Sequence, residues 1–314
     1  MLLVLTDSTD ETANYLCNKL ASVGVRFVRL DTDTCSQFVR IEYSHGSVVL
    51  SIEDLALPAE SIQTVWLRRP KPVVVDVVGD EAQRDHVANE WAEALHGYLA
   101  HIPLVRWINY PAANVGASHK LEQLTRAHRL GLVVPDTLVT QSYEKLEAFW
   151  RAMDGRVIAK PLASGYLERP EGISSSIYTS RVRREHLLSA PLDPCPTLFQ
   201  EEIAKVFDVR VTMIDEVVVG VALHGPSGGD VDVRRDNMRD VRYEVIKIPD
   251  SVEDSLRRLI ASYGLRFAAA DFGVTSDDSW LFFEVNPNGQ WAWLDLAGAT
   301  NLWEHFVHAF QAHA

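Results

Sequence analysis

The sequence has 314 residues and a mass of 35.2 kDa, enough for two or three domains with a sizeable core. Its 43 acidic and 30 basic residues give a formal net charge of -13, which argues against a general nucleic-acid binder, because such a protein needs a basic surface. The longest apolar runs, such as residues 217–223, are far too short for a membrane span. Three scattered cysteines without C-x-x-C spacing fit a reducing compartment, so we expect a cytoplasmic protein that binds neither nucleic acid nor membranes.

The first third of the chain predicts a Rossmann-like domain. Residues 2–6 form a short apolar run typical of a strand, and residues 25–30 alternate as a second strand. Between them, Ser8 and Glu11 have the spacing of a capping box at the start of a helix. This strand–helix–strand opening favours a parallel sheet. The segment lacks G-x-G-x-x-G, so we assign no dinucleotide site, and a reductase is disfavoured.

Further along, the sequence alternates between helical and strand patterns. Residues 39–43 and 48–52 flank a turn and predict a hairpin, and turn formers at residues 109–116 mark a boundary. Residues 163–176 contain two glycines, a proline and four serines and predict a mobile loop. We expect helices at 80–101, 118–130, 143–153, 251–263 and 302–312, and strands at 65–68, 133–139, 157–161, 198–203, 208–214, 217–223, 241–248, 267–274 and 280–286. The fold class is mixed α/β, with antiparallel hairpins toward the C-terminus.

The most informative pattern is the register of the hairpin predicted at residues 267–286. A two- or four-residue loop centred on residues 276–279 makes Asp271 face Glu284. Two facing carboxylates repel each other unless a positive group lies between them. Asn286 lies on the same strand face as Glu284. Three oxygen-bearing side chains in otherwise apolar strands predict a Mg²⁺ site, and the alternative is a solvated acidic face.

Three further segments carry charges that suit a phosphate. Asp208 and Arg210 share one face of a predicted strand; an arginine there can bind a phosphate or carboxylate, but such a pair is more often a structural ion pair. Lys160 ends an apolar strand and needs an anion, which is either a nucleotide phosphate or a buried carboxylate. Lys120 follows the turn-rich boundary, and by itself it indicates only a solvated lysine.

Taken together, these residues resemble the ATP-grasp superfamily from about residue 109 to the C-terminus. The matching set, in chain order, is Lys120, Lys160, Gln200, Glu201, Glu202, Ile203, Asp208, Arg210, Arg234, Asp271, Glu284 and Asn286. A narrower resemblance covers nearly the whole chain and is to the ATP-grasp ribosomal-peptide maturases, the graspetide or microviridin-type ligases, with the actinobacterial branch looking closest. Its segments are WLRRP, NYPAANVGASHKLEQL, GLVVPDTLVT, DVRVTMI and EVNPNGQWAWLD.

The resemblance implies a division into three parts. Residues 1–110 would form a Rossmann-like pre-ATP-grasp domain, residues 111–197 a small central α/β subdomain, and residues 198–314 an antiparallel-sheet subdomain that holds the Mg²⁺ and ATP site. Most of the tryptophans near the C-terminus are expected in the core, and Trp291 and Trp293, in a Gly-containing loop, are the two that could line a peptide groove.

The resemblance also implies an activity and its partners. A side-chain carboxylate of a ribosomal precursor peptide, which has a leader and a core, would attack ATP and become an acyl phosphate. A Thr or Ser hydroxyl or a Lys amine of the same peptide would then displace phosphate and close an ω-ester or ω-amide ring, with ADP as the other product. A homodimer is one oligomeric state that remains open.

The roles of single residues follow from the resemblance by position. Lys120 and Lys160 would hold the nucleotide phosphates, Gln200, Glu201, Glu202 and Ile203 would meet adenine, and Asp208 would lie near the ribose. Arg210 and Arg234 would be the catalytic cations, and Asp271, Glu284 and Asn286 would bind Mg²⁺. The loop at residues 163–176 would close over the phosphates and exclude water.

Two basic residues of the first domain are candidates for the peptide. Arg68 and Arg69 could bind its acidic side chains, and a structural ion pair is an equal alternative.

Two other functions remain open for the whole chain: a ligase that adds amino acids to a protein or peptide, and a non-catalytic ATP-binding module that regulates a partner.

Overall fold

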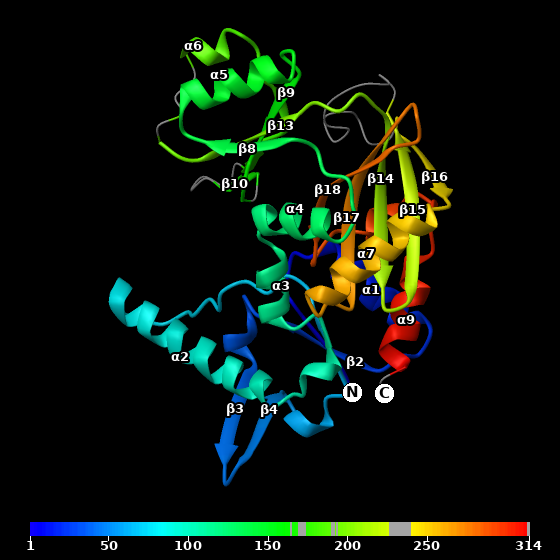
Figure 1. The fold of residues 1–314 in the computed structure, drawn as a ribbon. Helices are drawn as coiled ribbons and strands as arrows, with labels where there is room; N and C mark the ends of the chain where they lie inside the picture. Colours follow the sequence, from blue (N-terminus) through cyan, green and yellow to red (C-terminus); the bar gives the residue numbers. More distant parts are fainter. Residues whose placement is uncertain (164, 169–173, 190–191, 193, 226–239, 313–314) are drawn as a thin grey trace.

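The computed structural model describes residues 1–163, 165–168, 174–189, 192, 194–225 and 240–312, and its elements form three parts around a central cleft. In Figure 1 the central subdomain with α5 and α6 lies at the top, the C-terminal sheet at the right and the first domain below. The chain is mixed α/β, as the composition and patterns predict. In the described part of the chain, no helix combines the length and the apolar character that crossing a membrane requires.

The first domain contains the parallel sheet that the sequence predicts. Its strand order is β2-β1-β6-β7 and all neighbours are parallel. The bounds are β1 Leu2–Thr6, β2 Phe27–Asp31, β6 Thr64–Leu67 and β7 Trp107–Ile108, with α1 Glu11–Ser22 between β1 and β2. The predicted capping residue is wrong: Asp10, not Ser8, caps α1, because its carboxylate accepts from the amides of Thr12 at 3.0 Å and Ala13 at 3.3 Å.

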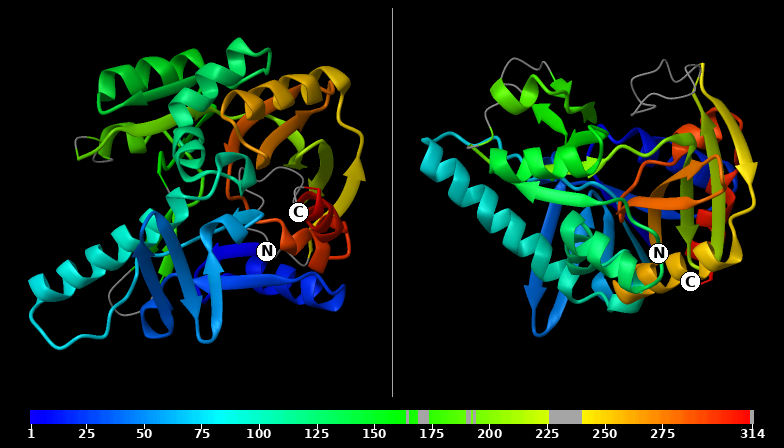
Figure 2. Two further views of the ribbon diagram at one scale, coloured as in Figure 1. Left: turned by 90° about the horizontal axis from the view of Figure 1, so that it is seen from below. Right: turned by 45° about the horizontal axis from the view of Figure 1, so that its top comes forward.

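A small antiparallel sheet and one long helix complete the first domain. Strands β3 Val39–Ser44, β4 Ser47–Ile52 and β5 Leu55–Pro58 pair in sequence order, which confirms the predicted hairpin. Helix α2, Glu81–Ala100, packs its C-terminal half near β3 and β4, and its N-terminal end points away from the rest of the chain in Figures 1 and 2. Three short 3-10 helices connect these elements, at Cys35–Gln37, Ala59–Ser61 and Leu104–Arg106.

The predicted turn-rich boundary at residues 109–116 is mostly a helix. Helix α3, Pro111–Ala117, begins with Pro111 in its first turn, where the ring's φ angle suits the helix and the missing N–H costs nothing. Tertiary contacts hold it, since Asn114 accepts from Asn109 at 3.0 Å. Helix α4, Lys120–Arg129, follows directly and packs on β18.

The central subdomain is a four-stranded antiparallel sheet of order β12-β9-β13-β8. Its strands are β8 Thr137–Thr140, β9 Val157–Lys160, β12 Ser180–Arg181 and β13 Thr197–Glu201, and its helices are α5 Tyr143–Ala152 and α6 His186–Ser189. Part of the predicted loop at residues 163–176 is instead a hairpin, because β10 Tyr166–Glu168 pairs with β11 Ser174–Ser176. Residues 164 and 169–173 of that loop lie outside the described residues.

The C-terminal sheet has five antiparallel strands in the order β16-β15-β14-β17-β18. Its strands are β14 Lys205–Ile214, β15 Val217–His224, β16 Arg242–Ile246, β17 Phe267–Thr275 and β18 Trp280–Asn286, and its helices are α7 Asp250–Ser262, α8 Ala292–Leu296 and α9 Leu302–Gln311. Helix α7 buries Leu256 and Leu259 in the core of this sheet. Helix α9 joins a second core, in which Phe306 packs against both Phe267 of this sheet and Trp66 of the first domain. The two sheets therefore share a core.

Candidate functional site

The hairpin of β17 and β18 places the two predicted carboxylates opposite each other. Asp271 pairs with Glu284, and Ala269 pairs with Asn286. The turn differs from the prediction, because the Thr275 amide donates to the Ser279 carbonyl at 3.1 Å, one residue away from the expected register. A bulge between Asp271 and Phe272 compensates this shift. The facing carboxylates are therefore confirmed, although the predicted turn is wrong by one residue.

Positive side chains of the chain itself lie beside both carboxylates. Arg210 faces Asp271 across β14 and β17, with Nε 3.3 Å from the Asp271 Oδ1. Lys120 Nζ lies 3.2 Å from Glu284 Oε2, and the Asn286 amide donates to Glu284 Oε1 at 3.1 Å. Burial raises the pKa of Glu284, but Lys120 and Asn286 outweigh it and hold that pKa below its ordinary range. The like-charge strain expected from the sequence is thus already offset without a metal ion.

Two more lysines approach the same face of the hairpin. Lys160 Nζ lies 5.0 Å from the centre of the Phe283 ring, and Lys205 Nζ lies 5.8 Å from it. Lys205 also pairs with Asp208, with Nζ 2.6 Å from Oδ1. Burial lowers the pKa of the Lys160 ammonium to about 8, and the neighbouring lysines add to this against the pull of Glu284. An anion bound there would stabilise the charged form of Lys160 and raise that pKa again.

A cleft of about 1980 Å³ joins these groups between the central and C-terminal sheets. The predicted site residues that line it are Arg69, Lys120, Lys160, Glu201, Glu202, Ile203, Asp208, Arg210, Asp271, Glu284 and Asn286. Arg234 lies outside the described residues. The structure therefore brings together eleven of the predicted residues from separate parts of the chain.

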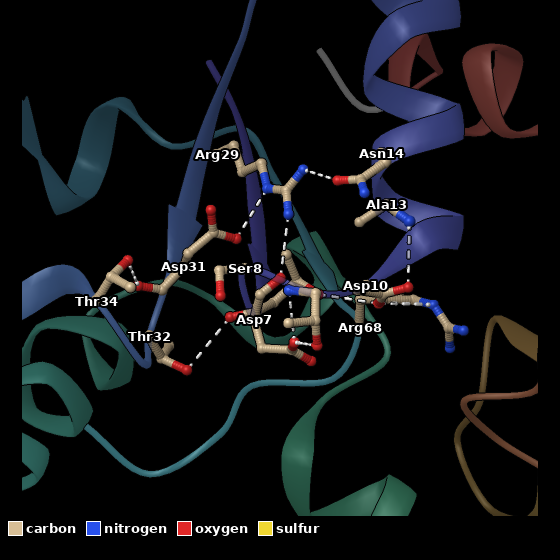
Figure 3. A network of polar contacts seen from close by, with 12 residues as sticks. Asp7, Ser8, Asp10, Ala13, Asn14, Arg29, Asp31, Thr32, Thr34 and Arg68 are labelled. Carbon is tan, nitrogen blue, oxygen red and sulfur yellow. Dashed lines mark hydrogen bonds and ion pairs between the residues drawn. The ribbon is translucent and has the colours of Figure 1, made fainter. Parts of the chain in front are cut away.

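Two predicted site residues do not line the cleft. Gln200 is 1% exposed, and its amide donates to Thr137 Oγ1 at 2.9 Å. Arg68 is also 1% exposed, and it forms an ion pair with Asp10 (Figure 3). A buried, paired guanidinium cannot reach a peptide in the cleft, so of the two adjacent arginines only Arg69 is placed for substrate. The prediction that Arg68 contacts substrate is corrected accordingly.

The segment after β13 offers backbone groups to the cleft. The amides of Glu201 and Glu202 already donate to the carbonyls of Asp136 and Arg156, each at 2.9 Å. Among the described residues, the amide N–H of Ile203 has no hydrogen-bond acceptor. This amide is therefore available to a ligand, as a hinge that meets adenine requires.

Several lining residues were not predicted from the sequence. They are Lys205, Phe283, Asn288, Gly289 and Gln290, and they follow or flank the predicted ligands in the chain. Proximity in the sequence was the signal that could have found them. Trp293 also lines the cleft, whereas Trp291 is fully buried and stacks on Phe306 at 4.4 Å. The peptide-groove role is therefore wrong for Trp291, which lies in the core, and it stays a prediction for Trp293.

The donor set of the hairpin fits a hard divalent cation. Asp271, Glu284 and Asn286 present two carboxylates and one amide oxygen, and Mg²⁺ usually takes one or two carboxylates and completes its shell with water and phosphate. No group of three or more His, Cys, Asp or Glu side chains placed to hold a metal occurs among the described residues. A cation held here would complete its shell with water and phosphate oxygens.

Comparisons with known proteins give the family context. Residues 1–114 match the family model of the MvdD pre-ATP grasp domain, and no curated protein matches the sequence. The macrocyclase MdnC of Microcystis aeruginosa MRC, solved with precursor peptide MdnA, is 25% identical, with 100% of each chain covered and a TM-score of 0.85. The macrocyclase MdnB of the same organism is 28% identical, with 98% of each chain covered and a TM-score of 0.78.

A third similar structure is the RiPP-associated ATP-grasp ligase of Chryseobacterium gregarium, solved with ADP and a leader and core peptide. It is 22% identical, with 98% of this chain and 94% of that chain covered and a TM-score of 0.84. The resemblance to ATP-grasp peptide maturases is therefore confirmed, while the actinobacterial branch stays a prediction. The chain has the ATP-grasp fold of the RiPP-associated ligases and macrocyclases, with a region matching the MvdD pre-ATP grasp domain at residues 1–114.

Proposed function

We propose that this protein is an ADP-forming ligase that closes ω-ester or ω-amide rings in a ribosomal precursor peptide. One observation carries the proposal: Arg210, Asp271 and Glu284 form a single row across three strands, and Lys120 and Lys160 face that row in one cleft. A cleft with paired carboxylates and surplus cations suits phosphoryl transfer, which depends on positioning and charge neutralisation. The similar macrocyclase MdnC was solved with a precursor peptide, which supports a peptide as the partner.

The central subdomain would bind the nucleotide. The unpaired amide of Ile203 donates to adenine, next to the cleft-facing Glu201 and Glu202. Lys160 and Lys120, which both line the cleft, hold the phosphates, and these anions would compensate the buried charge of Lys160. Asp208, already oriented by Lys205 at 2.6 Å, lies toward the ribose.

Asp271, Glu284 and Asn286 would hold Mg²⁺ together with the ATP phosphates. When bound, this ion supplies positive charge beside the transferring phosphoryl group. The chain's own contribution is to hold the two carboxylates in one register and to keep Lys120 and Arg210 beside them.

The reaction uses carboxylate activation followed by ring closure. A carboxylate oxygen of the peptide attacks the γ-phosphorus, the bond to the bridging oxygen breaks, and ADP leaves with that electron pair. A hydroxyl or amine of the same peptide then attacks the acyl phosphate carbon, loses its proton, and phosphate leaves. Arg210 neutralises the charge that develops on the phosphoryl oxygens, and its buried Nη1 has no protein acceptor in the described residues. The resemblance assigns the same role to Arg234.

The peptide would lie on the side of the cleft that the first domain and the loop after β18 line. Arg69 is exposed there, and no described residue forms an ion pair with it. A guanidinium so placed suits the acidic side chains of a core peptide. The domain limits near residues 110 and 197 are part of the same proposal.

The test is incubation of the purified protein with Mg²⁺, ATP and the linear peptide of a short neighbouring open reading frame that has a core rich in Thr and Asp or Glu. Mass spectrometry should show the loss of one water for each ring, with one ADP and one phosphate formed. Omission of ATP is the control. Addition of free glutamate to the peptide, with no dehydration, would instead favour the amino-acid ligase. ADP release without either product would contradict both.

A further inference from the structure

The loop that follows the predicted metal ligand Asn286 is held by side chains of the first domain. Residues 287–290 line the cleft next to Asn286. The side chain of Arg68, at the end of β6, donates to the carbonyl of Asn288, and Thr12 in α1 donates to the side chain of Gln290. One wall of the active-site cleft is therefore fastened to a domain that supplies none of the predicted metal ligands.

Arg68 is the central contact of this arrangement. Its side chain is 1% exposed, and its Nε lies 3.3 Å from the Asp10 Oδ2, which is fully buried. Burial lowers the pKa of Arg68 to about 10 against the attraction of Asp10, and at neutral pH it stays charged. A charge buried this deeply is costly unless its partners stay in place. The Asn288 carbonyl is one of those partners, so displacement of the loop would leave the buried guanidinium without this hydrogen-bond acceptor.

Asp10 ties the same contact to the start of the first helix. Figure 3 shows its carboxylate between Arg68 and the N-terminus of α1. It accepts from the amides of Thr12 and Ala13, at 3.0 and 3.3 Å, and from Thr6 Oγ1 at 2.9 Å. Asp10 therefore cannot follow Arg68 if the loop moves, and the position of Arg68 is set by the first domain.

Other contacts leave the loop little freedom. Asn109 donates to the carbonyl of Pro287 at 3.0 Å, and Asn114 donates to Asn288 Oδ1 at 3.1 Å. A Cβ on Gly289 would lie 2.4 Å from the Cβ of Ala269, so the loop packs directly on β17. Arg68 thus adds the charged contact to a loop that is already held by neutral ones.

We propose that Arg68 is a positioning residue. Through Asp10 and the Asn288 carbonyl, it fixes residues 287–290 and thereby sets the orientation of Asn286 toward Mg²⁺ and phosphate. This inference rests on the proposed function, because it concerns the metal ligands of that site. Positioning partners of metal ligands commonly change metal affinity by about 10- to 100-fold when they are replaced.

The test compares Arg68→Lys with Arg29→Lys. Lysine keeps the charge but has no fork to contact Asp10 and the loop carbonyl together. Arg29 is a matched control: it pairs with Asp31 at 2.8 Å and contacts Asn14 in the same network, but it does not contact residues 287–290. Isothermal calorimetry of ADP binding is measured over a Mg²⁺ titration, well below the melting temperature of each variant, and ring formation is measured in parallel.

We expect Arg68→Lys to need about tenfold more Mg²⁺ for half-maximal ADP binding, with ADP binding in EDTA unchanged. Arg29→Lys should keep the wild-type Mg²⁺ requirement even if its melting temperature falls. Equal Mg²⁺ requirements for Arg68→Lys and wild type, or the same increase in Arg29→Lys, would overturn the inference.

A second variant covers the case in which Arg68→Lys does not fold. Asp10→Asn keeps a side-chain oxygen for the cap of α1 but loses the charge that holds Arg68. It should also raise the Mg²⁺ requirement, and an unchanged requirement would count against Arg68 as the positioning group. A wild-type protein that binds no Mg²⁺ and ADP at all would refute the proposed function itself.

Discussion

Two networks of opposite charges, one in the first domain and one in the cleft, have similar distances but different surroundings. Arg68 and Asp10 lie 3.3 Å apart with exposures of 1% and 0%, whereas Arg210 and Asp271 lie 3.3 Å apart with exposures of 17% and 31%. The first pair is enclosed by a helix cap and a loop carbonyl. The second opens to a cleft of about 1980 Å³. Both arginines have buried guanidinium nitrogens without a hydrogen-bond partner among the described residues, so this feature does not separate the two pairs.

The comparison shows that distance alone does not tell a structural ion pair from a binding site. The distinction lies in whether a ligand can reach the pair, which exposure and the neighbouring cleft decide. Pairs that are enclosed by the chain hold its parts together, and partly exposed pairs beside a cleft can exchange a partner for a ligand. Each prediction below removes a charge from one of the two networks or from the rim of the cleft and asks whether binding or folding responds.

The largest effect is expected from Glu284→Gln in the cleft. This change keeps the shape and removes one charge of the predicted metal site, so ring formation should fall by about 10²-fold or more, because the lost stabilisation acts in the transition state. Since Lys120 loses its partner, the fold should be slightly less stable, by about 1 kcal/mol or less, and not more stable as the repulsion argument implied. Peptide mass spectrometry and thermal melts measure the two effects.

The matched control for this change is Glu216→Gln. The Glu216 side chain is 99% exposed and pairs with Arg257 on the surface, so its loss should leave ring formation unchanged. If Glu284→Gln still dehydrates the peptide at the wild-type rate, the assignment of Glu284 as a metal ligand is wrong.

The next largest effect should be the pH dependence of nucleotide binding through Lys160. Because burial lowers the pKa of Lys160 to about 8 from 10.5, wild-type affinity for Mg²⁺ and ADP should decline as the pH rises from 7 to 9. Lys160→Met should reduce affinity at pH 7 by about tenfold or more, since a charged hydrogen bond is lost, and should flatten the profile. Calorimetry measures both, with exposed Lys145→Met as the control.

The same group also has a stability signature with a definite sign. The unfolded Lys160 stays protonated up to about its ordinary pKa of 10.5, so burial of its charge destabilises the apo fold below pH 8 and the penalty fades between pH 8 and 10.5. Lys160→Met removes this burial penalty, so its melting temperature at pH 7 should be higher than that of the wild type. Each kcal/mol of free energy of unfolding gained corresponds to about 2–4 °C. A variant that melts lower than wild type at pH 7 would contradict the burial argument.

A smaller effect is expected from Arg69→Ala. If Arg69 meets the acidic core from the rim of the cleft, its loss should raise the KM for the peptide about fivefold and leave ADP affinity unchanged. Arg40→Ala is the control, because Arg40 is exposed on the same domain but does not line the cleft. An unchanged KM would place the peptide elsewhere.

Local patterns in the sequence predicted the parts of the site that depend on strand periodicity. The facing of Asp271 and Glu284 follows from a period of two, and it was correct even though the bulge at Phe272 was not foreseen. Patterns alone could not choose between Ser8 and Asp10 as the cap, because both types cap helices and the choice depends on Arg68 and Thr6, which lie elsewhere in the fold.

The same limit applies to the two arginines. Arg68 and Arg69 are adjacent on an extended segment, so one of them had to point inward. Only the packing of α1 and residues 287–290 decides which one. The turn-rich structure predicted for residues 109–116 was wrong for a similar reason: Asn114 is a turn former by propensity, yet Asn109 and Asn288 hold it in a helix.

The smallest effect should come from the first network, with Asp7→Asn. Burial raises the pKa of Asp7, but hydrogen bonds from Thr9 and the charge of Lys71 at 3.1 Å outweigh it and hold that pKa below the ordinary 3.8. The carboxylate therefore stabilises the fold above about pH 4, and this contribution is lost as the pH falls through the lower folded-state value. Asp7→Asn should lower the melting temperature at pH 7 by about 2–4 °C, and the difference from wild type should shrink toward pH 3.

Ring formation at 25 °C should be unchanged in Asp7→Asn, because Asp7 does not line the cleft and contacts no residue of 287–290. Asp54→Asn, which removes an exposed carboxylate of the same domain, should change neither quantity. A loss of ring formation in Asp7→Asn, at a temperature where the protein is fully folded, would mean that Asp7 as well as Arg68 affects the geometry of the cleft. Asp7 would then contribute to ligand binding in the cleft and not only to the stability of the first domain.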